Sequence, residues 1–263
     1  MSDSTLVDER ALARTYDGGY YTDGWDVIEQ YRRALSYARR HDAGSSATAT
    51  ALEVPRGRIR SWVDDNAVPD PVRAIDTALE YGWLDCGYGD PTFTGLNALV
   101  ANVFSGGSIA ESTYQPFFAL NHRGTDSHVI DALELANVSY RTVSDRDGRA
   151  DEVLPSDDGP VLGRVLSVLG APVGPKADQY LSLPAYLEDA PADVKETFVY
   201  AYLENRAVDY QEKATLTIRE QRNRSYLESL AELIESVAGE RVELGEKTIV
   251  ISADAARSLE IVR

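Results

Sequence analysis

The spacing of hydrophobic residues separates a helical N-terminal part from a longer part that mixes helices and strands. After a polar stretch rich in Gly and Tyr, apolar residues recur every three or four positions. They predict helices over residues 25–40, 47–53, 55–65 and 71–84. Ser46 is placed to cap the second helix, and Pro55 to open the third. We therefore expect a flexible arm over residues 1–24, followed by an all-α domain over residues 25–90.

From residue 96 the pattern becomes helix, strand, strand, helix, strand, strand, helix, and it then recurs in the same order. The predicted elements are helices over 96–104, 125–137, 194–204 and 223–238, strands over 113–121 and 213–219, and hairpins that turn at Asp147-Gly148 and Gly245. Two copies of an αββαββα unit predict a pseudo-twofold domain over residues 91–263. Its first repeat spans 95–170 and its second 171–263, so the expected fold class is α+β.

The composition excludes several classes of protein. With 43% hydrophobic residues in a chain of 263, a packed core is expected rather than disorder. No apolar run is long enough to span a membrane, and the N-terminus lacks a signal-peptide pattern. A single cysteine, Cys86, excludes a disulfide framework and a Cys-based zinc site, and three histidines leave little for a His-rich metal site. A soluble cytoplasmic protein is therefore expected, with no cofactor and no membrane partner.

The net charge of −17 is combined with a strong preference for arginine over lysine. Lysine occurs four times among the 26 basic residues. An acidic, lysine-poor composition is typical of halophilic proteins, which stay soluble in molar intracellular salt. There the Debye length is only about 3 Å, so distant carboxylates hardly repel a phosphate. The acidic composition therefore does not exclude nucleic acid as a partner.

The charge is unevenly distributed, and residues 32–60 form a basic island with a sum of +5. The island overlaps the stretch SSATATALEVPRGRIRSWVDDN, which has the pattern of a helix-turn-helix. In that motif the second helix enters the major groove, and arginine has the reach to read guanine. The predicted DNA-binding residues are Arg56, Arg58, Arg60 and Ser61 on the second helix, and Arg39 and Arg40 for the DNA backbone. The alternative is a small helical bundle whose arginines pair with acidic neighbours.

The stretch VLGRVLSVLGAPVGPKADQYLSLPAYLEDAPADVKETFVYAYLENRA resembles the second half of a LAGLIDADG homing endonuclease domain. It has that family's Leu-Gly pair, its Gly-Pro-Lys turn and its Ala-Pro-x-x-Val-Lys lead-in to the motif helix. The resemblance covers residues 96–262 and places the two motifs on residues 99–107 and 199–207. It implies two motif helices that pack through small residues, here Ala101 and Ala201, and sheets that form a saddle over DNA.

The chain departs from that family at the two catalytic positions. The family's metal-binding carboxylates correspond to Gly106 and Arg206, which cannot coordinate Mg²⁺. The resemblance therefore implies a domain without catalytic or metal-binding residues that keeps a DNA-facing surface. On the predicted strand of the second repeat this surface consists of Lys213, Thr215, Thr217 and Arg219, with Arg222 following. A helix-turn-helix joined to such a domain also resembles the WhiA family of transcription regulators, where the order of the two parts is reversed.

The sequence thus predicts a non-enzymatic DNA-binding protein, a nucleoid-associated transcription regulator derived from a homing endonuclease. Two alternatives stay open. The first is an active Mg²⁺-dependent endonuclease that uses substitute acids such as Glu111, Glu204 or Asp209. The second is a protein-interaction or structural module whose arginines only support the fold. The target site and the oligomeric state, including a homodimer or a protein partner, are not specified by the sequence.

Overall fold

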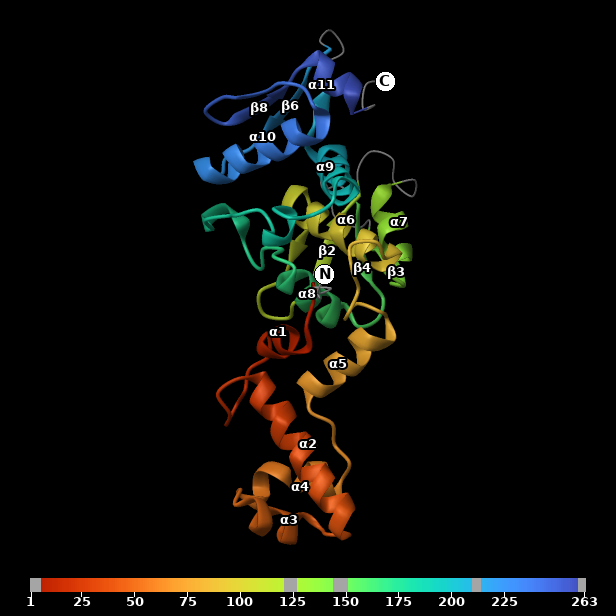
Figure 1. Cartoon of the computed structure of the whole chain (residues 1–263), viewed down its shortest axis with the longest axis vertical. Helices are drawn as coiled ribbons and strands as arrows, with labels where there is room; N and C mark the ends of the chain where they lie inside the picture. The colour runs from red at the N-terminus through yellow and green to blue at the C-terminus, as the bar shows by residue number, and fades with distance from the viewer. Residues whose placement is uncertain (1–5, 121–126, 144–150, 210–213, 260–263) are drawn as a thin grey trace. The chain divides into compact units, whose positions relative to one another are not determined.

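The computed structural model describes residues 6–120, 127–143, 151–209 and 214–259. It has two compact units: Val7–Glu80 form one, and Tyr81–Arg263 with the first six residues form the other. Helices occur in both units, and two four-stranded antiparallel sheets lie in the second (Figure 1). The α+β class expected from the sequence is therefore confirmed. Within the described ranges no helix is both long and apolar enough to cross a membrane.

The unit Val7–Glu80 is helical throughout. Its helices are α1 (Glu9–Arg14), α2 (Gly24–His41), α3 (Ser45–Leu52), α4 (Arg56–Asp64) and α5 (Asp70–Glu80). The last four coincide with the predicted helices, except that α5 ends four residues before the predicted end at residue 84. The unit therefore ends ten residues before the boundary at residue 90 that the sequence predicts.

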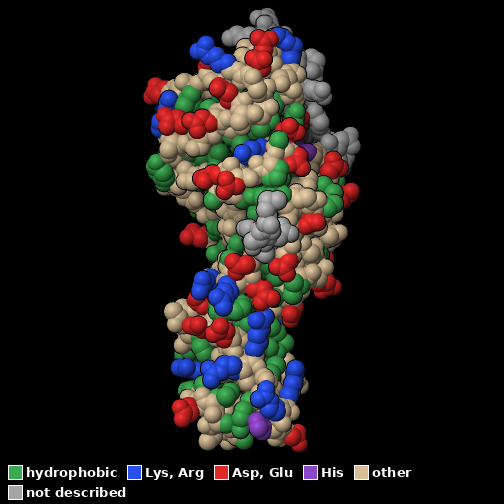
Figure 2. Space-filling model, in the orientation of Figure 1, with side chains coloured by type: hydrophobic (Ala, Val, Ile, Leu, Met, Phe, Trp, Pro, Cys, Tyr) green, Lys and Arg blue, Asp and Glu red, His purple; other side chains and the backbone are tan. Residues whose placement is uncertain are grey.

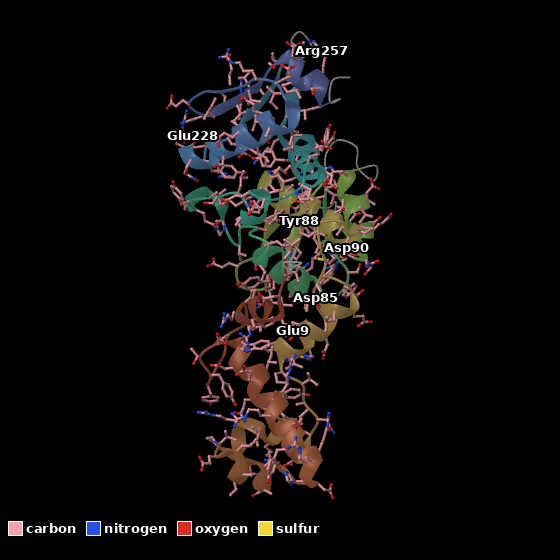
Figure 3. The ribbon with its side chains drawn as sticks, viewed as in Figure 1. Glu9, Asp85, Tyr88, Asp90, Glu228 and Arg257 are labelled. Carbon is pink, nitrogen blue, oxygen red and sulfur yellow. The ribbon has the colours of Figure 1, made fainter. Side chains whose placement is uncertain are left out.

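Residues 81–90 belong to the second unit because their aromatic side chains are part of its core. Trp83 is 1% exposed, and its Nε1 donates to the Ala136 carbonyl at 2.8 Å. The hydroxyl of Tyr88, labelled in Figure 3, donates to the Tyr186 carbonyl at 3.0 Å. Both contacts join residues that are distant in the sequence, and helical periodicity does not reveal such contacts. The prediction from periodicity therefore extended the preceding helix across the boundary between the units.

The prediction of a flexible arm over residues 1–24 is wrong for helix α1. Leu12 and Ala13 of this helix are fully buried, as is Val7 just before it. Asp8 caps the helix by accepting a hydrogen bond from the Ala11 amide at 2.9 Å. A helix of six residues is too short to produce a recognisable period, which explains why the sequence pattern missed it.

The start of α3 differs from the prediction that Ser46 caps it. Gly44 is the N-cap residue and makes no side-chain cap, while Ser46 is exposed. Instead, the Asp64 carboxylate at the end of α4 accepts two hydrogen bonds from Ser45, from the amide at 3.0 Å and from Oγ at 2.6 Å. The first turn of α3 is thereby tied to the last turn of α4.

The hydrogen bonds to Asp64 make the unit's stability depend on pH. The Ser45 hydroxyl first, and then the Ser45 amide and the Arg56 guanidinium, lower the pKa of this carboxyl. A lowered folded-state pKa contributes stability above the unfolded pKa of about 3.9, and this is lost as the pH falls through the folded pKa. We expect the midpoint of thermal unfolding of Val7–Glu80 to fall less between pH 6 and pH 3 in Asp64→Asn than in the wild type. Circular dichroism measures the unfolding of both proteins. An equal fall of the unfolding midpoint in the wild type and in Asp64→Asn would contradict this expectation.

Helices α2, α3 and α4 share one small hydrophobic core. Its buried residues are Ala34 from α2, Ala49 from α3 and Ile59 from α4. The partly buried side chains packed against them are Leu52, Val54, Trp62 and Val63. The positions of Ile59 and Trp62 on the inner side of α4 agree with the periodicity of that helix.

The second unit contains two successive groups of elements in the same order. The first group is α6 (Pro91–Ser105), β1 (Ser108–Ile109), β2 (Pro116–Ala119), α7 (His128–Leu135), β3 (Tyr140–Val143), β4 (Glu152–Pro155) and α8 (Gly159–Val168). After the 3₁₀ helices η2 (Lys176–Asp178) and η3 (Ala185–Leu187), the second is α9 (Ala192–Arg206), β5 (Val208–Asp209), β6 (Leu216–Arg219), α10 (Arg224–Ala238), β7 (Val242–Leu244), β8 (Thr248–Ile251) and α11 (Ala253–Ser258). The strand orders β1-β2-β4-β3 and β5-β6-β8-β7 correspond position by position.

The two groups meet along helices α6 and α9, which pack extensively against each other. Ala101 of α6 and Ala201 of α9 are small residues that are 0% and 4% exposed. Phe104 of α6 is 6.2 Å from Phe198 of α9 and 5.9 Å from Tyr226 of α10, measured between ring centroids. These aromatic contacts make α6 and α9 the centre of the unit's core.

The described strands are shorter than predicted. Strand β2 covers Pro116–Ala119 instead of residues 113–121, and β6 covers Leu216–Arg219 instead of 213–219. Ala214, predicted to face inward, is exposed and precedes β6. The hairpin predicted at Asp147-Gly148 exists as the antiparallel pair β3–β4, although the turn lies outside the described residues.

Candidate nucleic-acid interface

Helices α3 and α4 are joined by three residues, 53–55, of which Glu53 adopts a left-handed conformation with φ of 55°. A turn of this length is typical of helix-turn-helix pairs. On α4, Ile59 is fully buried, whereas Arg60 and Ser61 are exposed. One face of α4 is therefore fixed in the core while the other presents polar side chains.

Gly57, in the first turn of α4, has no side chain to cover the helix backbone. A Cβ atom at this position would have no neighbour within 4 Å, so packing does not require a glycine. An exposed glycine inside a helix costs about 0.5–1 kcal/mol relative to alanine. Here it gives a ligand direct access to the helix backbone between Arg56 and Arg60.

Arg56 has partners inside the unit, which the sequence did not indicate. Its Nε donates to Ser45 Oγ at 2.8 Å, and its Nη2 lies 3.4 Å from an oxygen of Asp64. This ion pair matches the alternative in which arginines pair with acidic neighbours. The side chain is still 54% exposed, so it can touch DNA only while it also supports the α3–α4 contact.

Arg58 lies against two tyrosines from the loop that precedes α2. Its guanidinium carbon is 5.5 Å from the ring centroids of both Tyr20 and Tyr21. Tyr20 is 84% exposed, the largest value among the exposed large hydrophobic residues of the described chain. Sequence analysis missed this loop because its tyrosines lie 37 and 38 positions before Arg58 in the sequence.

Arg39, Arg40 and Arg60 are exposed, and none of them has an ion pair among the described residues. Arg39 and Arg40 line a groove of about 680 Å³ between α2 and α5, together with Arg32. Figure 2 shows basic side chains, all of them arginine, at several places on the surface of this helical unit. The arginines predicted for the DNA backbone are therefore available at the surface.

In the second unit, strand β6 presents a mixed outer face. Leu216 and Ile218 are buried, while Thr217 is half-buried and Arg219 is exposed. Thr215 precedes the strand and is half-buried, and Lys213 lies outside the described residues. The alternation predicted for this strand holds over Leu216–Arg219.

Arg222 does not belong to that outer face. Its side chain is 13% exposed, and its Nε lies 3.9 Å from Oε2 of Glu220, a carboxylate that is 2% exposed. Arg206 approaches the other oxygen of Glu220, with 2.8 Å between Nε and Oε1. No sequence pattern indicated this cluster, because Glu220 lies in a run of polar residues and becomes buried only when distant segments pack together.

Lys176 completes the cluster from the loop after α8. Its ammonium donates to the carbonyls of Val103, Phe104 at 3.4 Å and Gly107 at 2.8 Å, which end helix α6. Burial, and then the positive charges of Arg206 and Arg222, lower its pKa to about 8 despite the opposing effect of Glu220. The cationic field thus outweighs the single carboxylate.

We expect Arg206→Gln to raise the pKa of Lys176, because the substitution removes one of the positive charges that disfavour the ammonium. The measurement is the Cε chemical shift of Lys176 as a function of pH, assigned with Lys176→Arg. Arg241→Gln serves as the control, since Arg241 is 78% exposed and pairs with Glu243. An unchanged titration in Arg206→Gln would mean that the two cations do not interact.

Gly106 and Arg206, the positions at which the sequence resemblance would place metal-binding carboxylates, lie at the ends of α6 and α9. Gly106 follows α6, and a Cβ on it would lie 3.8 Å from the Cβ of Asn205 in α9, so the two helix ends are adjacent. Asn205 Nδ2 donates to Ser105 Oγ at 2.9 Å across this junction. Within the described part of the chain, no group of three His, Cys, Asp or Glu residues could hold a metal ion.

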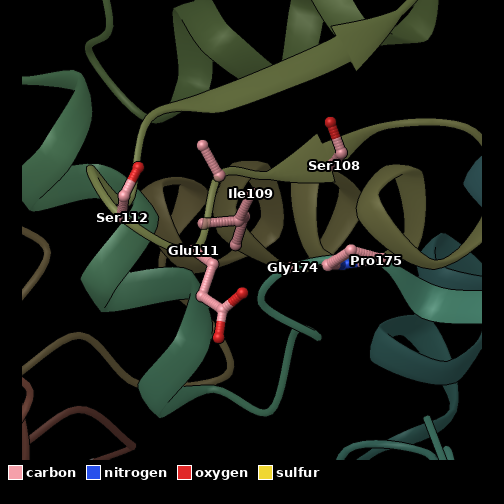
Figure 4. A pocket seen from close by; sticks show the side chains of 7 residues that line it. Ser108, Ile109, Glu111, Ser112, Gly174 and Pro175 are labelled. Carbon is pink, nitrogen blue, oxygen red and sulfur yellow. The ribbon is translucent and has the colours of Figure 1, made fainter. Parts of the chain in front are cut away.

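The substitute acids do not form such a group either. Glu111 lines an open cavity of about 540 Å³ with Ser108, Ser112 and Gly174 (Figure 4). Glu204 is half-buried on α9, and the side chain of Asp209 lies outside the described residues. The cavity therefore offers one carboxylate and two hydroxyls, which is insufficient for a Mg²⁺ site built from the described residues.

Comparison of the chain with protein-family models and with curated proteins finds no match.

Proposed function

We propose that this protein binds double-stranded DNA through a helix-turn-helix formed by α3 and α4, and that it acts as a transcription regulator. The observation that carries the proposal is the division of α4: Ile59 fills the core of the unit, whereas Arg60 and Ser61 are exposed beside the bare Gly57. Arginine on such a helix can donate two hydrogen bonds to guanine, and a missing side chain lets the helix backbone approach the DNA.

The surroundings of α4 support the same function. Arg39 and Arg40 lie in the last turn of α2, exposed and suited to contacts with phosphates. Arg58 is positioned by the rings of Tyr20 and Tyr21, which extends the cationic surface toward the loop before α2. In molar salt these contacts act at short range, because screening removes the repulsion from distant carboxylates.

We further propose that the second unit is a degenerate LAGLIDADG-like domain that does not cut DNA. This proposal is supported by the two αββαββα groups with corresponding strand orders. It is also supported by the packing of α6 against α9, each of which buries a small residue, Ala101 or Ala201. A non-catalytic role is supported by Gly106 and Arg206 at the helix ends, where an acidic metal site would have to lie. The outer face of β6, with Thr217 and Arg219, is the candidate for a second contact with DNA.

The proposal is tested by selecting bound fragments from a genomic DNA library in molar potassium chloride with Mg²⁺ present. We expect enrichment of intact sites that share a sequence motif. The matched control is the same selection with Arg58→Gln/Arg60→Gln, which should enrich nothing.

Two outcomes would overturn parts of the proposal. Fragments cut in a Mg²⁺-dependent manner would show that the second unit is an active nuclease. No enrichment by the wild-type protein, together with recovery of a defined protein complex, would favour the interaction module. Equal enrichment by wild type and variant would remove α4 from the interface.

A further inference from the structure

The junction between the ends of α6 and α9 holds a cluster of charges that the proposed DNA interface does not use. The cluster consists of Lys176, Arg206, Arg222 and Glu220. Three of these side chains are cationic, and the single anion, Glu220, is 2% exposed. No other carboxylate forms an ion pair with the three cations in the described part of the chain.

The arginines of the cluster are held in place without being saturated. Arg206 Nε and Arg222 Nε contact Glu220 at 2.8 and 3.9 Å. Arg222 Nε, at this longer distance, has no hydrogen bond within the described ranges, whereas the Glu220 carboxylate is also hydrogen-bonded with the Tyr202 hydroxyl. Arg222 Nη1 donates to the Lys176 carbonyl at 3.3 Å, which links the loop after α8 to the segment after β6. Buried polar groups without such partners call for a bound group or water.

The balance of charge favours an anion. The carbonyl ends of α6 and α9 each contribute about half a negative charge, and Glu220 contributes one more. Against these stand three cations, so among the described residues about one positive charge remains uncompensated at the junction. Burial is the first cause of the lowered pKa of Lys176, and the positive charges of Arg206 and Arg222 lower it further against the opposing effect of Glu220.

We propose that the junction of α6 and α9 is a binding site for one phosphate group, held by Arg206 and Arg222 with Lys176 beneath. The planar guanidinium matches the geometry of a tetrahedral oxyanion and donates two hydrogen bonds to it. Arg206 is 36% exposed, so it is the residue through which the phosphate enters from solvent. The phosphate belongs either to a nucleic-acid backbone or to a free phosphate ion, and the site is independent of the helix-turn-helix.

The first test titrates inorganic phosphate into the full-length protein by calorimetry, at constant ionic strength in potassium chloride. We expect saturable binding of one phosphate per chain, weakened about 10- to 100-fold in Arg206→Gln, because a charge-assisted hydrogen bond is lost. Arg241→Gln, on the same unit, should bind as the wild type does. Arg206→Lys keeps the charge beside Glu220 and should recover part of the affinity, which separates loss of the site from loss of folding.

The second test distinguishes the source of the phosphate. In the Arg58→Gln/Arg60→Gln background, residual binding to duplex DNA should fall when Arg206→Gln is added if the site takes a backbone phosphate. An unchanged residual affinity together with binding of inorganic phosphate assigns the site to the free ion. Absence of phosphate binding by the wild type, with no effect of Arg206→Gln on DNA binding by a folded protein, overturns the site and leaves the helix-turn-helix untouched.

Discussion

Arg58→Gln/Arg60→Gln is expected to weaken binding to the selected DNA site by about 100-fold or more, because each arginine contact to a base is worth about 1–3 kcal/mol. Arg60 is exposed and has no ion pair among the described residues, so its substitution leaves the fold of α4 unchanged. Within the described part of the chain, the Arg58 guanidinium lies against the rings of Tyr20 and Tyr21. Gel-shift titration in molar potassium chloride measures the loss.

Arg56 is left out of this variant because it supports the fold. Replacing it would remove the contacts to Ser45 and Asp64 and so mix a loss of stability with a loss of affinity. Arg73→Gln is the matched control, since Arg73 is exposed on α5 of the same unit and pairs with Asp70. The control should bind DNA as the wild type does, and its far-ultraviolet circular dichroism should match that of the double variant.

The salt dependence of binding separates the two kinds of contact. The slope of log affinity against log salt concentration is negative, and each phosphate contact that is lost reduces its magnitude by about 0.9. If the double variant has a reduced affinity but an unchanged salt dependence, Arg58 and Arg60 contact bases and not phosphates. If the affinity of the double variant equals that of the wild type, the helix-turn-helix assignment is wrong.

The largest effect on stability is expected for Phe104→Ala in the second unit. Phe104 is 1% exposed and lies between Phe198 of α9 and Tyr226 of α10, so it joins the two groups of elements. Truncating a buried phenylalanine costs about 3–5 kcal/mol through lost transfer energy and the cavity left behind. For a domain of this size we expect the midpoint of thermal unfolding to fall by about 6–20 °C.

Differential scanning calorimetry measures this change, and Phe104→Leu is the control. Leucine keeps most of the buried volume and should cost much less than alanine. A loss below about 1 kcal/mol for Phe104→Ala would mean that α6 and α9 do not carry the core of the unit. The signal of the helical unit, to which Phe104 does not belong, serves as an internal reference.

The sequence by itself determined helices α2 to α5 of the first unit, but not α1, and the order of elements in the second unit. Periodicity located α2 and α4, because apolar residues recur every three or four positions along each helix, such as Val27 and Tyr31 in α2 and Ile59 and Trp62 in α4. The turn at 53–55 and the hairpin β7–β8 followed from local signals that act over a few residues. Such signals depend on conformational preferences of neighbouring residues, which is the information that a single sequence contains.

Tertiary structure alone decided which charged residues turn toward a carboxylate inside the protein and which stay exposed. Arg56 and Arg60 stand four positions apart on one helix, yet only Arg56 has a carboxylate, Asp64, within reach. Arg222 and Arg219 follow each other closely, but Arg222 turns inward to Glu220 while Arg219 stays exposed. A side chain's partner depends on which segments pack together, and residues such as Lys176 and Arg206 meet only when α6 and α9 do. The sequence therefore specified where the arginines are, and the packing of distant segments specified what each of them can bind.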